Sequence, residues 1–333
     1  MKNFYIGFIL LFFSCDNSEQ MVLVQDSGEA QGTFYNIQYL SENGDSYKIK
    51  IDSLLKRIDS SVSIYKSYSI ISKLNNGEKV QTDDIFNSVY SDAVNVYLTT
   101  DGYFDCTVSP LVSYWGFYKN WGQEKIDVDS LRIQEILKCI GTNKTYRLDS
   151  SVFLEADVQL DFNAIAQGYS VDLIADLFED SGIHNYLIEV GGEIKASGVN
   201  KDDKVWKVGI DKPLEEIDID DRFQFILELD NKSLATSGNY RKFYEKDGVK
   251  FSHTINPMTG YPAQNRLLSV TVMTNKCSLA DAYATAFMAM GVEKTKKLVD
   301  YIDDQLDVYL IYTDKDGSWK TYISPGMREK IIN

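Results

Sequence analysis

Residues 158–192, VQLDFNAIAQGYSVDLIADLFEDSGIHNYLIEVGG, predict a strand, a helix and a second strand in that order. Apolar side chains recur every fourth residue across positions 163–178, at Ile165, Tyr169, Leu173 and Leu177. This period is typical of a helix with one buried face, and Gly182 can terminate it. The run 186–190 then reads as a strand that ends in Gly191-Gly192. Helix and strand in this mixture indicate an α+β fold.

The same two periodicities predict further elements on both sides of this stretch. We expect strands at 33–39, 205–210 and 223–229, helices around 54–58 and 85–97, and a last helix at 278–290. Turns are expected at Asn43-Gly44-Asp45 and Asp101-Gly102, and the acidic run 215–221 as a solvated loop. No Pro/Gly/Ser-rich linker divides the chain, so we expect a single mature domain at residues 28–333, with mixed sheets and packed helices.

Composition excludes some classes of function. The chain has 333 residues, 44% of them hydrophobic, which is enough for a full core without disulfides. Its net charge is −15, so nucleic acid would be repelled. An anionic ligand would be repelled as well, and binding one would need local help such as a divalent cation.

The N-terminus has the features of an export signal. Lys2 is followed by an apolar run over residues 4–13 and then by Ser14-Cys15. The run is too short to span a bilayer and resembles a bacterial lipoprotein signal, which implies cleavage before Cys15 and acylation of its thiol. Residues 16–27 would form a tether, and the protein would be exported and lipid-anchored on the periplasmic side of the membrane. A plain secretory peptide or a buried N-terminus is the alternative.

The other cysteines and the histidines do not suggest a zinc site. Cys106, Cys139 and Cys277 are odd in number and lack metal-ligand spacing, so each is expected to be a small core residue. His184 follows a helix and precedes an apolar strand, where a structural role is the simpler interpretation. His253 lies in SHTINPMTGYP, residues 252–262, a loop made rigid by two prolines and a glycine, and could act as a general base for a hydroxyl.

Residues 278–291, SLADAYATAFMAMG, place one carboxylate and one hydroxyl on the same helical face, at Asp281 and Thr285. Such a pair suits Mg²⁺ when water and phosphate oxygens complete the shell. Ser278 and Asp281 also fit a capping box, in which the acid only caps the helix. The helix alone favours that capping interpretation.

Residues 161–169, DFNAIAQGY, could bind a pyrophosphate. Asn163 is a good N-cap, small Ala164 and Ala166 permit close approach, and a helix start offers N–H groups to an anion. A capped helix packed on a strand would look the same. Gly191-Gly192 and the stretch 236–238 would let a flat ligand approach the backbone, but no GxGxxG or P-loop motif supports Rossmann or P-loop binding.

In order and spacing, these stretches resemble the ApbE family, the FAD:protein FMN transferases, over almost the whole mature chain. The matching positions are 32–33, 72–75, 100–107, 110–111, 115–117, 161–172, 189–194, 236–238, 253–262, 269–272 and 280–282. The resemblance implies FAD in a central cleft with Mg²⁺ on its diphosphate, held by the Ala164 carbonyl and the side chains of Asp281 and Thr285. That reverses the preference for capping at Asp281.

The resemblance also implies individual roles. His253 is the candidate base, and the implied FAD contacts are Gln31, Ser72, Lys73, Leu74, Tyr103, Phe104, Asp105, Asp161, Gln167 and Ile255. Three positions depart from the family pattern: Gln31 where Met is usual, Gln167 where Lys is common, and Asn256 where Asp is frequent. These departures bear on FAD affinity and loop geometry more than on reaction type.

The implied reaction is transfer of FMN from FAD to a Thr or Ser hydroxyl of an exported acceptor flavoprotein, with release of AMP. An FAD pyrophosphatase would use the same site with water as the nucleophile. A non-catalytic FAD-binding lipoprotein would leave FAD intact, and a structural lipoprotein or adhesin would need no site at all.

Overall fold

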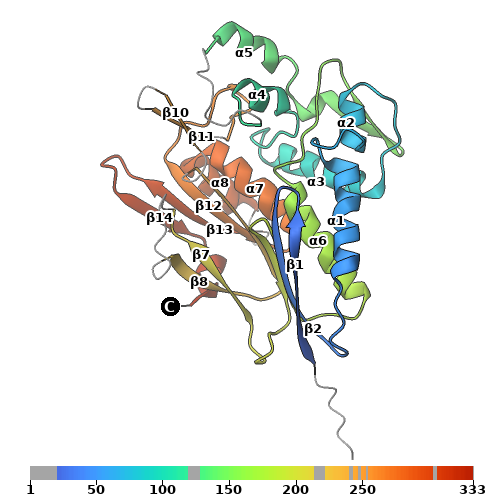
Figure 1. Ribbon diagram of the computed structural model, residues 1–333. Coiled ribbons are helices and arrows are strands. Elements are labelled where there is room, and N and C mark those ends of the chain that lie inside the picture. Colours follow the sequence, from blue (N-terminus) through green and yellow to red (C-terminus); the bar gives the residue numbers. More distant parts are fainter. Residues whose placement is uncertain are drawn as a thin grey trace, which may run out of the picture.

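The computed structural model describes residues 21–118, 128–213, 222–239, 243–246, 249–252, 254–302 and 306–332. These residues form three layers: a group of helices, a large central sheet, and a small sheet with one short helix (Figure 1). The α+β class expected from the sequence is confirmed.

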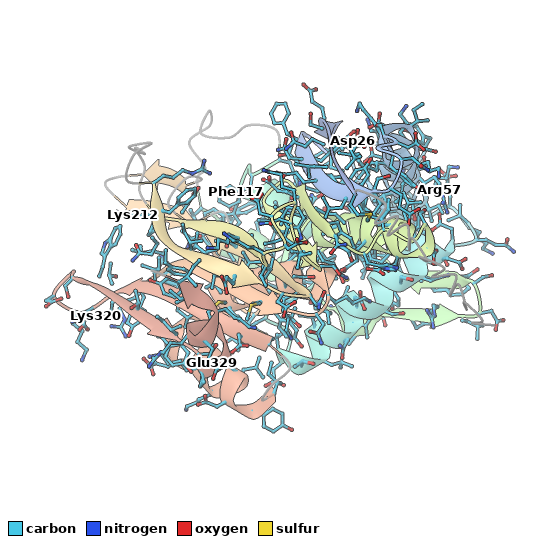
Figure 2. All side chains as sticks on the ribbon, turned by 90° about the horizontal axis from the view of Figure 1, so that it is seen from below. Asp26, Arg57, Phe117, Lys212, Lys320 and Glu329 are labelled. Atoms are coloured by element: carbon cyan, nitrogen blue, oxygen red, sulfur yellow. The ribbon has the colours of Figure 1, made fainter. Side chains whose placement is uncertain are left out.

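The central sheet is antiparallel between all its neighbouring strands. Among the described residues it has eight strands, in the spatial order β1 (Val22–Ala30), β2 (Thr33–Ser41), β5 (Tyr186–Val190), β6 (Glu193–Ser197), β9 (Lys232–Gly238), β12 (Leu267–Thr274), β13 (Leu306–Thr313) and β14 (Trp319–Ile323). The edge strands β1 and β14 carry Asp26 and Lys320, which lie at opposite ends of the molecule in Figure 2.

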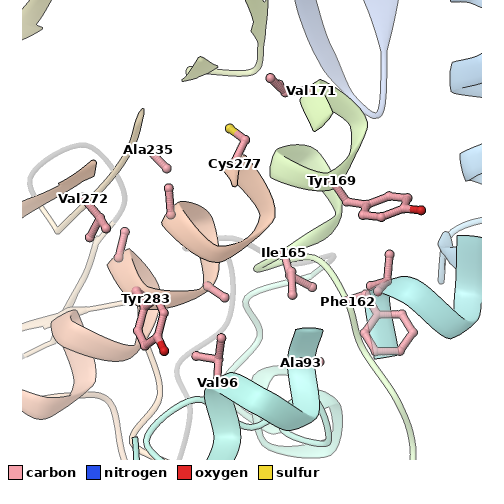
Figure 3. Close-up of a cluster of buried hydrophobic side chains, with 14 of the residues drawn as sticks. Ala93, Val96, Phe162, Ile165, Tyr169, Val171, Ala235, Val272, Cys277 and Tyr283 are labelled. Carbon is pink, nitrogen blue, oxygen red and sulfur yellow. The ribbon is translucent and has the colours of Figure 1, made fainter. Parts of the chain in front are cut away.

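Helices cover one face of this sheet. They are α1 (Lys48–Val62), α2 (Ile70–Asn75), α3 (Asp84–Thr99), α6 (Ala166–Asp180), α7 (Cys277–Met290) and α8 (Val292–Ile302). The main hydrophobic core joins helix side chains such as Phe178 and Phe287 to strand side chains such as Val272. Figure 3 shows α6 beside α7, with Ala93 and Val96 of α3 packed below them.

The opposite face of the sheet is covered by β7 (Trp206–Asp211), β8 (Phe223–Leu229), β15 (Ile331–Ile332) and helix α9 (Pro325–Lys330). Met327 of α9 and Leu227 of β8 pack there against Met273 of β12. Along β12, Val272 therefore faces the helices and Met273 faces the small sheet, as the two-residue period of a strand requires. Because both faces are covered, seven of the eight side chains of β12 are buried, including its serine and threonines.

A smaller cluster lies at the end of the molecule that carries α4 (Ser109–Tyr114) and α5 (Ser130–Leu137) (Figure 1). Trp115, just after α4, donates a hydrogen bond from Nε1 to the carbonyl oxygen of Gly260 at 2.8 Å. This bond ties α4 to the loop 254–262. The remaining elements are the 3-10 turn η1 (Thr142–Lys144) and the hairpins β3 (Thr145–Leu148) with β4 (Ser151–Leu154) and β10 (Phe243–Lys246) with β11 (Val249–Ser252).

The predicted tether at 16–27 is wrong in its second half. Residues 22–30 form β1, which pairs with β2 from Val22 opposite Ser41 to Ala30 opposite Thr33. The strand was missed because it lies at the sheet edge and lacks an alternating apolar face. Its one buried side chain is Asp26, which accepts a hydrogen bond from the Tyr39 hydroxyl at 2.8 Å.

Three further predictions also need correction. The strand expected at the start of residues 158–192 does not form, because residues 158–160 have no regular secondary structure. The helix expected from Asn163 begins three residues later, at Ala166, and its N-cap is Ile165 rather than Asn163. Residues 163–165 instead form a turn in which the Asn163 N–H donates to Asp161 Oδ1 at 2.8 Å. The helix expected to be the last, α7, is followed by α8 and α9.

The prediction of small core residues is confirmed for Cys106 and Cys277 but is wrong for Cys139, and the structural role predicted for His184 agrees with the structure. Cys106 and Cys277 are buried free thiols, and Cys139 is half-buried and free. His184 lies on the surface, with Nδ1 2.6 Å from Glu179 Oε2. Across the described part of the chain, no helix is both long and apolar enough to cross a membrane. The export signal with Cys15, the acidic run 215–221 and His253 lie outside the described residues.

Candidate functional site

A cavity of about 600 Å³ opens where the start of α6, the middle of α7 and the loops after α1 and α3 meet. Most of the residues expected from the sequence line it, although they come from distant parts of the chain. They are Gln31, Tyr103, Phe104, Asp105, Asp161, Ala164, Gln167, Ile255, Asp281 and Thr285.

Asp281 and Thr285 face the cavity from one side of α7. Oδ2 of Asp281 accepts a hydrogen bond from the backbone N–H of Gly168 at 3.2 Å. The Thr285 hydroxyl lies 3.4 Å from that of Ser237 in β9. Burial raises the pKa of Asp281 to about 7. A positive partner in the cavity would therefore favour the ionised form of Asp281.

The capping interpretation of Asp281 is wrong. The N-cap of α7 is Lys276, which makes no side-chain cap bond. The first N–H groups of α7 are instead bonded by a residue of α6, because Asp172 accepts from the N–H of Cys277 and of Ser278, each at 2.9 Å. Asp281 is thereby left to face the cavity.

Asp161 and two tyrosines form another wall. Oδ2 of the buried Asp161 accepts a hydrogen bond from the Tyr118 hydroxyl, and burial raises the pKa of Asp161. Tyr65 meets the Tyr118 ring edge-on, with 6.4 Å between centroids, and its hydroxyl accepts from Asn163 Nδ2 at 3.2 Å. A carboxyl beside two rings suits a flat ligand that carries N–H donors.

The loop after α3 is held by Asp105. Its Oδ1 accepts from the hydroxyls of Thr107 and Thr142 at 2.6 and 2.8 Å, and its Oδ2 accepts from the Thr142 N–H at 3.2 Å. Burial raises the pKa of Asp105 despite these bonds. Asp105 thus shapes the cavity wall, while Lys294 of α8 donates a hydrogen bond to the hydroxyl of Tyr103.

Gln31 lies in the tight turn between β1 and β2, with a left-handed φ of 54°. Its Nε2 donates to the Ser170 hydroxyl at 2.6 Å. Its buried Oε1 has no hydrogen-bond partner among the described residues, so a ligand donor could bind there. Gln167 Nε2 packs against Gly191, where an added Cβ would lie only 2.8 Å from it. Both departures from the family pattern therefore face the cavity.

Asn256 preserves the loop geometry that an aspartate would give. Its Oδ1 accepts from the Met258 N–H at 2.9 Å, and its own N–H donates to the Tyr261 carbonyl at 2.9 Å. An aspartate at this position could accept the same bond.

Three predicted contacts are not brought to the cavity. Among the described residues, the lining does not include Ser72, Lys73 or Leu74 of α2. Leu74 packs in the main core, and the Ser72 hydroxyl donates to the carbonyl of Ser63, which does line the cavity, at 3.4 Å. The predicted base, His253, has no described position. The next residues, Thr254 and Ile255, line the cavity.

Other lining residues escaped prediction from the sequence. The most prominent are Tyr65, Tyr118, Asp59 and Glu193. Tyr65 and Tyr118 lie in irregular segments where no periodicity marks them, and only the folded chain brings them together at the cavity. Ser237 belongs to a stretch, 236–238, in which the sequence suggested close approach of a ligand.

Fold and cavity together define a class: an α+β protein whose buried carboxylate and hydroxyl groups share one cavity with an aromatic wall. The chain belongs to the ApbE family, whose model matches residues 31–310. Within the described residues, no group of three or more Asp, Glu, His or Cys side chains is placed to bind a metal ion.

Relatives and solved structures agree with this membership. The chain is 33% identical to the FAD:protein FMN transferase of Vibrio cholerae, over 98% of both chains. It is 30% identical to the enzyme of that name from Escherichia coli K12, over 97% of this chain and 95% of the relative. The flavin transferase ApbE structure from Vibrio cholerae superposes with a TM-score of 0.81 at 33% identity, over 93% and 99% of the chains. The apo flavinyl transferase ApbE structure from Pseudomonas stutzeri superposes with a TM-score of 0.82 at 27% sequence identity, over 93% of this chain and 97% of the other.

Proposed function

We propose that this chain transfers FMN from FAD to a Thr or Ser hydroxyl of an exported acceptor protein, in a reaction that needs Mg²⁺. One observation carries the proposal. A single cavity joins Ala164, Asp281 and Thr285, expected to hold the metal, to the wall of Asp161, Tyr65 and Tyr118. A diphosphate next to an aromatic ring requires both features together.

The donor set of the cavity fits Mg²⁺. A carboxylate and a hydroxyl, four residues apart on α7, and a backbone carbonyl at Ala164 are hard oxygen ligands, and the absence of a larger acidic cluster in the described chain leaves room for phosphate oxygens and water. When bound, Mg²⁺ would neutralise the diphosphate, which a protein of net charge −15 otherwise repels. Asp281 and Thr285 would hold the ion.

The remaining lining residues would bind and orient FAD. Asp161 can accept N–H groups of a ring, Tyr65 and Tyr118 can pack against it, and Gln31 Oε1 can accept one further donor. Positioning of this kind is the main contribution that a protein makes to phosphoryl transfer.

The chemical step forms one P–O bond and breaks another. The hydroxyl oxygen of the acceptor protein attacks the phosphorus of the FMN half, and the bond to the AMP oxygen breaks, so AMP leaves with that electron pair. His253 would take the hydroxyl proton, consistent with its place next to the lining residues Thr254 and Ile255.

The location of the protein is part of the proposal. A signal cleaved before Cys15 would anchor the chain by lipid on the periplasmic side, where it could meet an exported acceptor protein. The Cys15→Ser variant, expressed in bacteria fed a clickable fatty acid, should lose both the label and its membrane association. Label retained in the variant would contradict acylation at this residue.

Activity is tested with the chain from residue 16 onward, FAD, Mg²⁺ and an exported flavoprotein, by intact-mass analysis of that flavoprotein. We expect a gain of one FMN group, abolished by Asp281→Ala. FAD split to FMN and AMP without a protein adduct would identify a pyrophosphatase instead. Intact FAD with several acceptor proteins would leave only a binding protein.

A further inference from the structure

Asp172 connects two helices that form the cavity. It lies on α6, is only 5% exposed, and accepts the N–H groups of Cys277 and Ser278 at 2.9 Å each. These are the first two residues of α7. Both carboxylate oxygens are used, one for each N–H, so the bonds restrain the helix start in rotation as well as along its axis.

A third element holds the carboxylate in place. Lys195 of β6 lies 3.2 Å from Asp172 Oδ1, and its side chain is 20% exposed. The ion pair fixes Asp172 relative to the central sheet. Asp172 therefore joins α6, α7 and the sheet at one point.

One turn earlier on α6, Gly168 makes a second contact with α7. Its N–H donates to Asp281 Oδ2, and an added Cβ would lie 2.3 Å from the carbonyl oxygen of Cys277. The two helices touch backbone to backbone here, at the start of α7 where Figure 3 labels Cys277. A shift of α7 would therefore move Asp281 relative to α6.

We propose that Asp172 is a positioning residue: by capping α7 from α6, it sets the carboxylate of Asp281 and the hydroxyl of Thr285 opposite the Ala164 carbonyl. This inference rests on the proposed Mg²⁺-dependent binding of FAD. Asp172 does not line the cavity described above and acts through the helix start. Groups that orient metal ligands typically affect metal affinity about 10- to 100-fold.

The test is Asp172→Asn, which keeps the volume but replaces one acceptor oxygen by an NH₂ group that cannot bond a helix N–H. FAD binding is followed by flavin fluorescence without acceptor protein, across a Mg²⁺ titration. We expect the Mg²⁺ concentration for half-maximal FAD binding to rise about tenfold. FAD affinity at saturating Mg²⁺ should change less than twofold.

Two control variants separate positioning from general loss of stability. Asp180→Asn makes the same chemical change two turns further along α6, at an exposed residue. Met327→Ala opens the core on the far side of the sheet and lowers Tm without touching α6 or α7. Both variants should show the Mg²⁺ dependence of the wild type, although Met327→Ala has a lower Tm.

Three results would overturn the assignment. The first is wild-type Mg²⁺ dependence in Asp172→Asn. The second is an equal rise, in Met327→Ala, of the Mg²⁺ concentration for half-maximal FAD binding, which would mean that any loss of stability weakens the metal site. The third is FAD binding to the wild type that ignores Mg²⁺, which would also remove the metal from the proposed function. Normal Mg²⁺ dependence in the wild type without FMN transfer would overturn the proposed function alone and leave the role of Asp172 supported.

Discussion

Among single residues, Asp281 shows how burial prepares a side chain for a ligand. It is 7% exposed and shares its wall of the cavity with the hydroxyls of Thr285 and Ser237. The neutral form is favoured without a cation because an isolated buried carboxylate is poorly solvated. The charge is therefore most stable when a metal ion is present.

This residue predicts a pH dependence of stability in the metal-free protein. The folded pKa of Asp281 is raised to about 7 from an ordinary value of 3.8, so the folded state holds a proton that the unfolded chain has lost. The free energy of unfolding should therefore fall as the pH rises from 3.8 through 7, then level off. If Asp281 holds Mg²⁺ as proposed, stabilisation by Mg²⁺ should be larger at pH 8 than at pH 6, because the ion would bind the ionised carboxylate.

Thermal melts at both pH values, with and without Mg²⁺, measure this effect. Asp281→Asn, which cannot titrate, should lose the corresponding part of the pH dependence and the gain from Mg²⁺. An equal Mg²⁺ shift at the two pH values would contradict the prediction.

Tyr118 supplies a second prediction for a single side chain. In Tyr118→Phe the ring stays beside Tyr65, but Asp161 loses a donor, and a hydrogen bond to a charged group contributes about 1.5–3 kcal/mol. KM for FAD should rise several-fold while kcat changes little, since Asp161 is expected to bind FAD and not to react. Steady-state kinetics at saturating Mg²⁺ measure both, and a fall in kcat with unchanged KM would show that the hydroxyl acts in the chemical step instead.

For individual residues, the sequence predicted those that belong to ordered motifs and missed those joined only in space. Asp281, Thr285, Gln31 and Asp161 were all found to line the cavity. Tyr65 was missed because an exposed tyrosine in a loop carries no periodic signal. Its role depends on Tyr118, more than fifty residues away along the chain.

Among the elements, the packing of α6 on α7 shows what local patterns can and cannot predict. Apolar residues at every fourth position correctly predicted that α6 is a helix, and the pattern of residues 278–290 correctly predicted α7. The predicted N-caps were wrong at both helices. At α7 the reason is that its first N–H groups donate hydrogen bonds to a carboxylate of another helix. A cap of this kind follows from tertiary structure and leaves no mark within a few residues of the helix start.

Gly168→Ala tests this helix contact. The added Cβ has backbone 2.3 Å away, so α6 and α7 must separate, and overpacking of this kind costs about 1–3 kcal/mol. We expect a lower Tm and weaker Mg²⁺-dependent FAD binding. Asp176→Ala, an exposed change on the same helix, should alter neither by much, and wild-type FAD binding in Gly168→Ala would show that the helices can separate without harm to the site.

At the scale of the whole molecule, the layered fold depends on its first strand. The sequence predicted a single α+β domain with the correct class, but it placed the domain start at residue 28. Edge strand β1 begins at Val22 and completes the sheet next to β2. An edge strand of mixed polarity is hard to predict from its sequence. It pairs with only one neighbouring strand, and its side chains show no alternating apolar pattern.

A chain that starts at residue 28 should therefore be less stable than one that starts at residue 21. It loses most of the β1–β2 pairing and exposes the core residues Tyr39 and Ile37 at a new sheet edge. We expect a lower Tm and more aggregation in thermal melts followed by light scattering. Equal melting of the two chains would mean that β1 contributes nothing to the fold.

The distance along the chain between Ala164 and Asp281 has a consequence for how the protein becomes active. Both residues line one cavity, although strands β5 to β12 lie between them along the chain. The ligand site therefore belongs to the high-contact-order part of the fold and should be among the last parts to form during folding. No fragment that ends before α7 can contain it. Refolding followed by flavin binding should then lag behind refolding followed by secondary structure, and bound FAD should stabilise the chain against global unfolding rather than against local fraying.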